Sequence, residues 1–192
     1  PMHRLFVAIR PPEAVLDALL DTTDGIDGAR WQSEDQLHLT LRFVGEVERP
    51  AANDLAEALA EVQAPAFDLQ VAGTGHFERK GRPHAVWARV LPSTGLDLLH
   101  GRVERACQLA GLPRESRKFL PHVTLARLPG GAGPIAPWLA DTGMLTVPHW
   151  QVDRFTLYES HLGKAGSIYQ PVVDYPLGAT EITAVPVNRT GR

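Results

Sequence analysis

Two four-residue stretches, His38-Leu39-Thr40-Leu41 and His122-Val123-Thr124-Leu125, organise the fold that this sequence predicts. Both have the form His-apolar-Thr-Leu, and each lies inside an apolar run. In a β-strand, side chains two positions apart share a face and neighbours face opposite ways. His38 and Thr40 would then share an open face while the leucines enter a core, and the second stretch repeats this pattern. Two such strands side by side would form one acid–base site.

The composition is that of an ordinary globular protein. The 192 residues are 44% hydrophobic and 21% charged, with a net charge of −3. No global basic field favours nucleic acid, so an anionic substrate must be held by a local cluster of cations and N–H groups. The single cysteine, Cys107, lies in a helical pattern and is predicted to be a buried thiol. Because there is no long apolar run and no signal-peptide pattern, we expect no membrane association and a cytoplasmic protein.

Apolar periodicity divides the chain into strands and helices. Glycine and proline residues, which favour turns, separate these elements. Gly45 is expected to end the second strand, and residues 78–83 are expected to form a charged hairpin turn. The predicted strands are residues 5–9, 37–44, 67–71, 84–90, 122–127, 150–160 and 167–175, and the predicted helices are residues 12–20, 50–62, 94–109 and 137–140.

The order of these elements favours the α+β class. Hairpins segregated from helices exclude a doubly wound parallel sheet. One His-Thr strand in each half of the chain is a weak internal duplication, which predicts two similar lobes facing one another across a central cleft.

The two motifs carry the groups needed to cleave a phosphate diester. Histidine acts as an acid or a base near neutral pH, so two facing imidazoles can divide the roles of taking and giving a proton. Thr40 and Thr124 would donate hydrogen bonds to the non-bridging oxygens, and nearby cations would stabilise the charge without a metal ion.

Strict alternation places the cations near the two motifs on different faces of their strands. Arg42 shares the parity of His38 and Thr40 and is expected on their face. Arg127 has the opposite parity from the second motif and would reach the cleft only if its strand bends or ends there. Lys118 and its neighbour Arg117 are candidates for charge at the rim. Phe43 has the parity of the leucines and is expected in the core.

A single His-x-Thr-Leu segment is weak as a signal, because such side chains mostly satisfy one another or water. Two copies in one chain, each followed within a few residues by an arginine, favour a functional site. The other histidines lack such partners and are expected to be surface or structural residues: His3, His76, His84, His100, His149 and His161.

The sequence resembles the two-histidine (2H) phosphoesterase superfamily, and within it the bacterial and archaeal RNA 2′,3′-cyclic phosphodiesterases, also called 2′-5′ RNA ligases. The resemblance extends from the start of the chain to about Tyr175, so that residues 1–178 are expected to form one bilobal domain and residues 179–192 a C-terminal tail. The segments that carry it are RLFVAI (4–9), LHLTLRFVGE (37–46), VW (86–87), FLPHVTLAR (119–127) and FTLYES (155–160).

The resemblance implies an antiparallel sheet in each lobe, with helices outside and no cofactor or metal. It also implies hydrolysis of a terminal 2′,3′-cyclic phosphate to a 2′-phosphomonoester. In this scheme His122 activates water and His38 protonates the leaving O3′, although the reverse order stays open. The threonines bind the phosphate, and Arg127 adds charge; Arg42 is a phosphate ligand on parity alone.

The remaining expectations concern the substrate. Phe43 or Phe119 is a candidate to stack on the terminal base. Expected partners are RNA ends with a 2′,3′-cyclic phosphate, or small cyclic nucleotides, bound by a monomer. The alternatives are joining of RNA ends through a 2′-5′ linkage in the same cleft and a non-catalytic RNA-end or nucleotide-binding module. A metallohydrolase is disfavoured, because no carboxylate or third histidine lies at ligand spacing.

Overall fold

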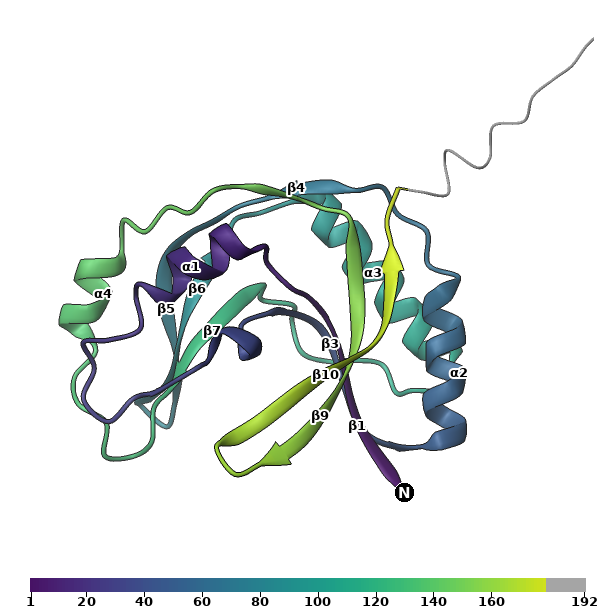
Figure 1. Ribbon diagram of the computed structural model, residues 1–192, viewed down its shortest axis with the longest axis horizontal. Helices are drawn as coiled ribbons and strands as arrows, with labels where there is room; N and C mark the ends of the chain where they lie inside the picture. The colour runs from purple at the N-terminus through teal and green to yellow at the C-terminus, as the bar shows by residue number, and fades with distance from the viewer. Residues whose placement is uncertain (179–192) are drawn as a thin grey trace, which may run out of the picture.

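The computed structural model describes residues 1–178, and its strands and helices follow the order predicted from the sequence (Figure 1). The predicted tail, residues 179–192, lies outside the described residues. The strands are β1 (Met2–Ile9), β2 (Arg30–Trp31), β3 (Leu39–Glu48), β4 (Phe67–Leu69), β5 (Val71–Arg79), β6 (Arg82–Val90), β7 (His122–Arg127), β8 (Trp150–Val152), β9 (Arg154–Gly163) and β10 (Gly166–Pro176). The α-helices are α1 (Glu13–Leu20), α2 (Arg49–Ala60), α3 (Thr94–Leu109) and α4 (Ala136–Thr142), and a 3₁₀ turn spans Glu34–Gln36.

The strands form an eight-stranded antiparallel sheet in the order β10-β9-β1-β3-β7-β6-β5, with β2 added beside β7. A second, two-stranded sheet pairs β4 with β8. The α+β class is therefore confirmed. Strands β3 and β7 pair through Leu39 and Val123, so the two lobes are halves of one sheet. Because this is the only residue pair between β3 and β7, the join is narrow. This narrow join lies within the two His-Thr segments.

Helices cover the outer side of both halves of the sheet. Helix α2 packs on β1 and β3, α3 packs on β3 and against α2, and α4 packs on β5 (Figure 1). Helix α2 begins with a proline in its first turn, and the Ser93 hydroxyl caps α3 by accepting a hydrogen bond from the Leu96 N–H. The apolar faces of these two helices enter one core: Leu55 and Leu59 on α2, and Leu96, Leu99, Val103 and Cys107 on α3. The prediction of a buried Cys107 is confirmed.

A one-residue bulge in β3 changes which side chains face the pocket. Thr40 pairs with Ala8, but Arg42 pairs with Val7, so the leucine between them has no partner of its own. Such a bulge reverses the alternation of side chains beyond it. The prediction of Phe43 as a core residue is therefore wrong: its side chain is 48% exposed. Arg42 is buried instead and turns toward the helices, so the prediction that it shares the face of Thr40 is also wrong.

The second His-Thr strand carries the same bulge at the same place. In β7, Thr124 pairs with Trp87 and Ala126 pairs with Val86, so one leucine again lacks a partner. The reversed alternation brings Arg127 back to the face of Thr124, and its side chain is exposed. Strict alternation would have pointed Arg127 away from the cleft, and this bulge explains why it does not.

Several element boundaries differ from the predicted ones. Strand β3 continues through Gly45 to Glu48, because Gly45 adopts a positive φ of 84° at a second irregularity in the β1–β3 pairing. The predicted strand 67–71 is divided between β4 and β5, and the predicted strand 150–160 between β8 and β9. No helix among residues 1–178 is both long enough and apolar enough to cross a membrane.

Candidate active site

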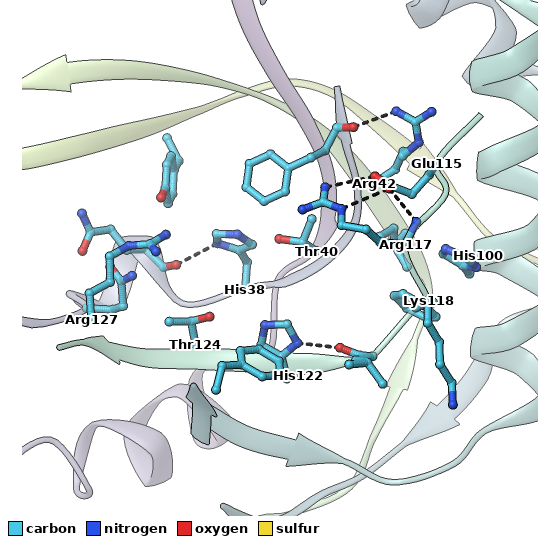
Figure 2. A pocket seen from close by; sticks show the side chains of 18 residues that line it. His38, Thr40, Arg42, His100, Glu115, Arg117, Lys118, His122, Thr124 and Arg127 are labelled. Atoms are coloured by element: carbon cyan, nitrogen blue, oxygen red, sulfur yellow. Dashed lines mark hydrogen bonds and ion pairs between the residues drawn. The ribbon is translucent and has the colours of Figure 1, made fainter. Parts of the chain in front are cut away.

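Both histidines and both threonines of the motifs line one pocket at the join between the halves of the sheet (Figure 2). The fold thus brings together the two segments that the sequence predicted to meet. Arg42, Arg127, Phe43 and Phe119 also line this pocket. Further lining residues are Gln32, Gln36, Leu41, Phe77, His100, Glu115, Arg117, Lys118, Leu120 and Tyr169.

The two imidazoles are oriented in the same way by the backbone. Nδ1 of His38 lies 2.7 Å from the Gln36 carbonyl oxygen, and Nδ1 of His122 lies 2.5 Å from the Leu120 carbonyl oxygen (Figure 2). A carbonyl oxygen only accepts, so each Nδ1 carries a hydrogen and donates it. Nε2 is left on each ring as the site that takes or gives a proton.

An aromatic cluster on the pocket side of the sheet supports His38. Phe6 stacks on the imidazole with ring centroids 4.8 Å apart, and Tyr169 meets it edge-on at 5.2 Å. Phe6, Ala8 and Tyr158 form a small buried cluster separate from the main core. This support could not be predicted from the sequence, because β1 is apolar on both faces and its alternation gives no signal.

His122 has its own aromatic support from the β5–β6 hairpin. Phe77 meets the imidazole edge-on with centroids 4.9 Å apart, and the Trp87 ring lies 6.0 Å away. Trp87 lies across Gly75, where an added Cβ atom would overlap the indole ring. Gly75 is therefore required for this position of Trp87.

Burial sets the protonation of both histidines. Burial is the main cause that lowers the pKa of His38 to about 4, and the positive charges of His122, Arg10 and Arg127 lower it further. The hydrogen bond to the Gln36 carbonyl acts in the opposite direction. Burial also lowers the pKa of His122, while its hydrogen bond to the Leu120 carbonyl acts in the opposite direction. Both imidazoles are therefore mainly neutral at neutral pH when the pocket holds no anion.

The threonines present hydroxyl groups to the same pocket. Thr40 and Thr124 are half-buried. Neither hydroxyl forms a hydrogen bond to another residue of the described chain, so both are available to a ligand. A ligand anion between the imidazoles would meet these two donors and the exposed guanidinium of Arg127.

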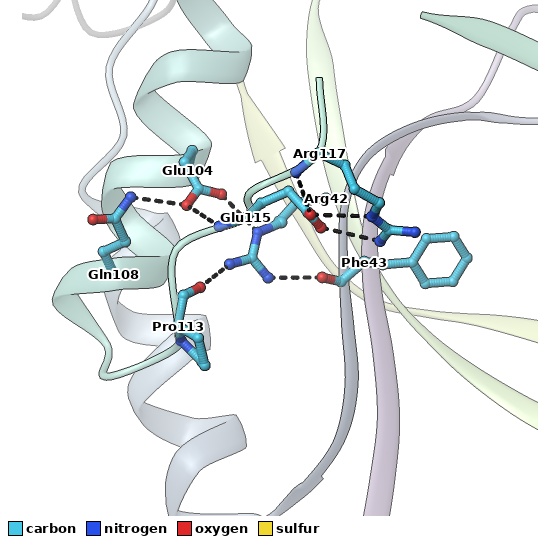
Figure 3. A network of polar contacts seen from close by, with 7 residues as sticks. All are labelled: Arg42, Phe43, Glu104, Gln108, Pro113, Glu115 and Arg117. Atoms are coloured by element: carbon cyan, nitrogen blue, oxygen red, sulfur yellow. Dashed lines mark hydrogen bonds and ion pairs between the residues drawn. The ribbon is translucent and has the colours of Figure 1, made fainter. Parts of the chain in front are cut away.

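Arg42 is held in a buried polar network in which each of its guanidinium nitrogens donates to a protein oxygen (Figure 3). Its Nε donates to Glu104 Oε1 at 2.6 Å, and its remaining nitrogens donate to the Phe43 and Pro113 carbonyl oxygens. Burial opposes ionisation of Glu104, but hydrogen bonds from Arg42, the Glu115 N–H and Gln108 hold the pKa of its carboxyl below the usual range.

The two aromatic candidates for base stacking differ in availability. Phe119 already stacks on His100, with centroids 3.8 Å apart and the rings nearly parallel, whereas Phe43 exposes about half of its side chain. Within residues 1–178, no cluster of three or more histidine, cysteine or carboxylate side chains is arranged to hold a metal ion.

Comparison with known proteins identifies the family. The sequence matches the family described as the 2′-5′ RNA ligase superfamily over residues 24–164. The chain belongs to this superfamily. The family resemblance drawn from the two motifs is therefore confirmed, and the matched region contains both histidines.

Curated relatives share one name. An Aeropyrum pernix protein named RNA 2′,3′-cyclic phosphodiesterase is 34% identical over 144 residues, which cover 73% of this chain and 82% of the relative. A Thermus thermophilus protein of the same name is 32% identical over 185 residues, which cover 91% of this chain and 90% of the relative.

Solved structures share the fold. The Thermus thermophilus protein TT0787 superimposes with a TM-score of 0.74 at 30% identity, covering 91% of this chain and 98% of the other. Escherichia coli LigT complexed with 3′-AMP gives a TM-score of 0.75 at 25% identity, covering 92% of this chain and 99% of the other. The bilobal α+β architecture is therefore that of the superfamily.

Proposed function

We propose that this protein is an RNA 2′,3′-cyclic phosphodiesterase that opens a terminal 2′,3′-cyclic phosphate to a 2′-phosphomonoester. The observation that carries the proposal is the matched pair of imidazoles, each with Nδ1 bonded to the carbonyl two residues earlier, in one pocket with two unbonded threonine hydroxyls. The shared name of the curated relatives supports the substrate class.

The reaction uses the two Nε2 atoms in opposite protonation states. As water attacks phosphorus, one imidazole takes its proton, a P–O bond to the water oxygen forms, and the P–O3′ bond breaks. The other imidazole gives its proton to O3′. Thr40 and Thr124 donate to the non-bridging oxygens, and Arg127 stabilises the added negative charge.

We assign His122 as the base and His38 as the acid. In the free protein the pKa of His38 is lowered to about 4, which disfavours the acid form. Burial is the largest cause of this lowering, and Arg127, whose charge adds to it, lines the pocket that would hold the phosphate. A bound anion offsets this positive charge and raises the pKa of His38, so the proton is taken up together with the substrate.

The assignment is tested with a substrate that carries sulfur in place of O3′. A thiolate leaves without protonation, so loss of the general acid costs much less on this substrate. We expect His38→Ala to recover most of its lost rate relative to the oxygen substrate, and His122→Ala to recover none. The opposite pattern would reverse the two roles.

The activity itself is tested by end-group analysis of an oligonucleotide with a 2′,3′-cyclic phosphate. We expect a 2′-phosphate product that also forms in EDTA. His38→Ala and His122→Ala should each lower kcat by about 10²- to 10⁴-fold, the usual contribution of a general acid or base. His161→Ala, which removes an exposed histidine bonded to Gln170, is the matched control and should leave kcat unchanged.

The same assay separates the alternatives. A 2′-5′-linked product in the presence of 5′-hydroxyl RNA ends would indicate ligation as the main reaction. Binding without any product would indicate a non-catalytic module. A 3′-phosphate product or loss of activity in EDTA would contradict the proposed chemistry.

A further inference from the structure

A groove continues from the active-site pocket across Phe43 toward the loop that joins α3 to β7. We call it the loop groove; it is lined by Arg42, Phe43, Val44, Gly45, Pro113, Arg114, Glu115 and Arg117. Four of these residues also line the active-site pocket: Arg42, Phe43, Glu115 and Arg117. The loop groove therefore adjoins the active-site pocket, and a chain that leaves the histidines in this direction would pass these shared residues.

The loop groove is basic in a protein whose net charge is −3. Arg114 and Arg117 line the groove and expose their side chains, and so does Lys118, the next residue of the loop, which lines the active-site pocket. Glu115 pairs with Arg117 through two contacts of 3.1 Å. Neither Arg114 nor Lys118 forms an ion pair within residues 1–178. Three cations against one carboxylate leave this loop with a net charge of +2.

The loop is fixed in place by the Arg42–Glu104 network (Figure 3). Arg42 donates to the Pro113 carbonyl at the start of the loop. Oε2 of Glu104 accepts the Glu115 N–H at 3.1 Å. These contacts hold the loop backbone on both sides of Arg114, beside the pocket.

We propose that the loop groove binds the RNA chain on the 5′ side of the cyclic phosphate, so that the preferred substrate is an oligonucleotide and not a cyclic mononucleotide. This inference rests on the proposed function. A terminal 2′,3′-cyclic nucleotide continues only through its 5′ oxygen, so every further phosphate lies on that side. Arg114 in the groove and Lys118 at the adjoining active-site pocket supply charge for these phosphates, and Phe43 supplies an exposed ring for stacking, the combination that binds single-stranded RNA.

The other opening beside the active site is less suited to a polyanion. It is lined by Tyr158, Tyr169 and one cation, Arg10. The Arg10 guanidinium donates to the Glu34 carbonyl and lies 3.9 Å from the Asp35 carboxylate. A phosphate that entered there would be repelled by the Asp35 carboxylate. Arg114 and Lys118, by contrast, form no ion pair with a carboxylate within residues 1–178.

The test compares two substrates, cytidine 2′,3′-cyclic phosphate and a pentanucleotide with the same cyclic end, in wild type and in Arg114→Gln/Lys118→Gln. We expect wild type to have the higher kcat/KM on the pentanucleotide. The double variant should lower the ratio of pentanucleotide to mononucleotide kcat/KM at least about fivefold at low salt. Loss of two phosphate contacts should also flatten the slope of log(kcat/KM) against log salt by about 1.4 for the pentanucleotide, at about 0.7 per contact.

The matched control is Arg102→Gln/Arg105→Gln, which removes two exposed cations from the outer face of α3. This variant should keep the wild-type ratio and salt slope. Equal turnover of both substrates by wild type, or the same loss on both substrates in the loop variant, would overturn the inference.

Binding separates this inference from the proposed reaction. A fluorescent pentanucleotide ending in a 2′-phosphate measures affinity without turnover, and the loop variant should weaken it about fivefold. If the wild-type protein turns over neither substrate but binds the pentanucleotide through Arg114 and Lys118, the proposed reaction is contradicted and the proposed RNA-binding role of the groove is supported. If turnover is normal and the loop variant binds the pentanucleotide as tightly as wild type, only the proposed RNA-binding role of the groove is contradicted.

Discussion

Burial of His38 and His122 determines how activity depends on pH. The pH profile of kcat/KM reports the pKa values of the free enzyme. Burial lowers both imidazole pKa values from 6.5, that of His38 to about 4. We therefore expect the maximum of kcat/KM for cytidine 2′,3′-cyclic phosphate below pH 6.5. The kcat profile, which reports the bound complex, should lie at higher pH because the anion favours the imidazolium.

Parallel kcat and kcat/KM profiles from pH 4 to 9 provide the measurement. A maximum of kcat/KM at or above pH 7 would contradict the assignment of two buried, neutral imidazoles. His76→Ala, which removes a partly exposed histidine paired with Glu78, should leave both profiles unchanged.

Gly75 controls the position of His122 through Trp87. A Cβ atom at position 75 would overlap the indole, so Gly75→Ala must displace Trp87 toward or away from the imidazole that it supports. We expect kcat to fall about tenfold or more, because small displacements of a catalytic group are costly. The pH profile should shift as the burial of His122 changes. Gly101→Ala on α3, where nothing lies within 4 Å of the added methyl, is the control and should not lower kcat.

Arg42 connects three elements, β3, α3 and the loop before β7, through its buried guanidinium. Arg42→Met would leave the Glu104 carboxylate, which is 16% exposed, without its cation. Removing one member of such a pair typically costs about 3 to 5 kcal/mol. We expect a loss of stability of this size in urea unfolding and faster amide exchange in residues 113–118.

The double variant Arg42→Met/Glu104→Gln should recover part of the stability, because no unpaired charge remains. It should not recover the preference for the pentanucleotide, since the loop loses its contacts to both residues. Wild-type exchange in residues 113–118 of Arg42→Met would show that the network does not hold the loop.

The bulges in β3 and β7 mark the limit of what alternation predicts. Parity correctly placed His38, Thr40, His122 and Thr124 in one pocket, because all four precede the bulges. Beyond each bulge the alternation reverses, so parity failed for Arg42, Phe43 and Arg127 alike. Bulge positions depend on pairing with β1 and β6, which a single strand's sequence does not reveal.

The elements themselves followed from local signals. Helix α3 and strand β7 have the predicted bounds, since a Ser cap, a Gly-containing stop and a strongly patterned run define their ends. The splits at β4/β5 and β8/β9 were not predictable, because β4 and β8 leave the main sheet to pair with one another. Such pairing joins residues about eighty positions apart and has no local signature.

The whole molecule combines a narrow join between its strands with a continuous core. The halves of the sheet are hydrogen-bonded only through Leu39 and Val123, yet one cluster of buried side chains runs beneath both. Cys107 in this cluster belongs to α3 on the first half, and Trp138 belongs to α4 on the second half. The shared core, together with the β4–β8 pair between the strands that lead into β5 and β9, therefore couples the lobes and keeps the two imidazoles in one pocket.

Because the core is shared, we expect residues 1–178 to unfold in one cooperative transition. The buried Cys107 thiol, whose pKa burial raises to about 11, should become reactive only on global unfolding. The free energy from its labelling should equal that from tryptophan fluorescence, which reports mainly on the second half through Trp31, Trp87 and Trp138. Labelling of Cys107 at urea concentrations that leave the fluorescence unchanged would contradict this coupling, and would mean that the first half opens by itself while His122 stays in place.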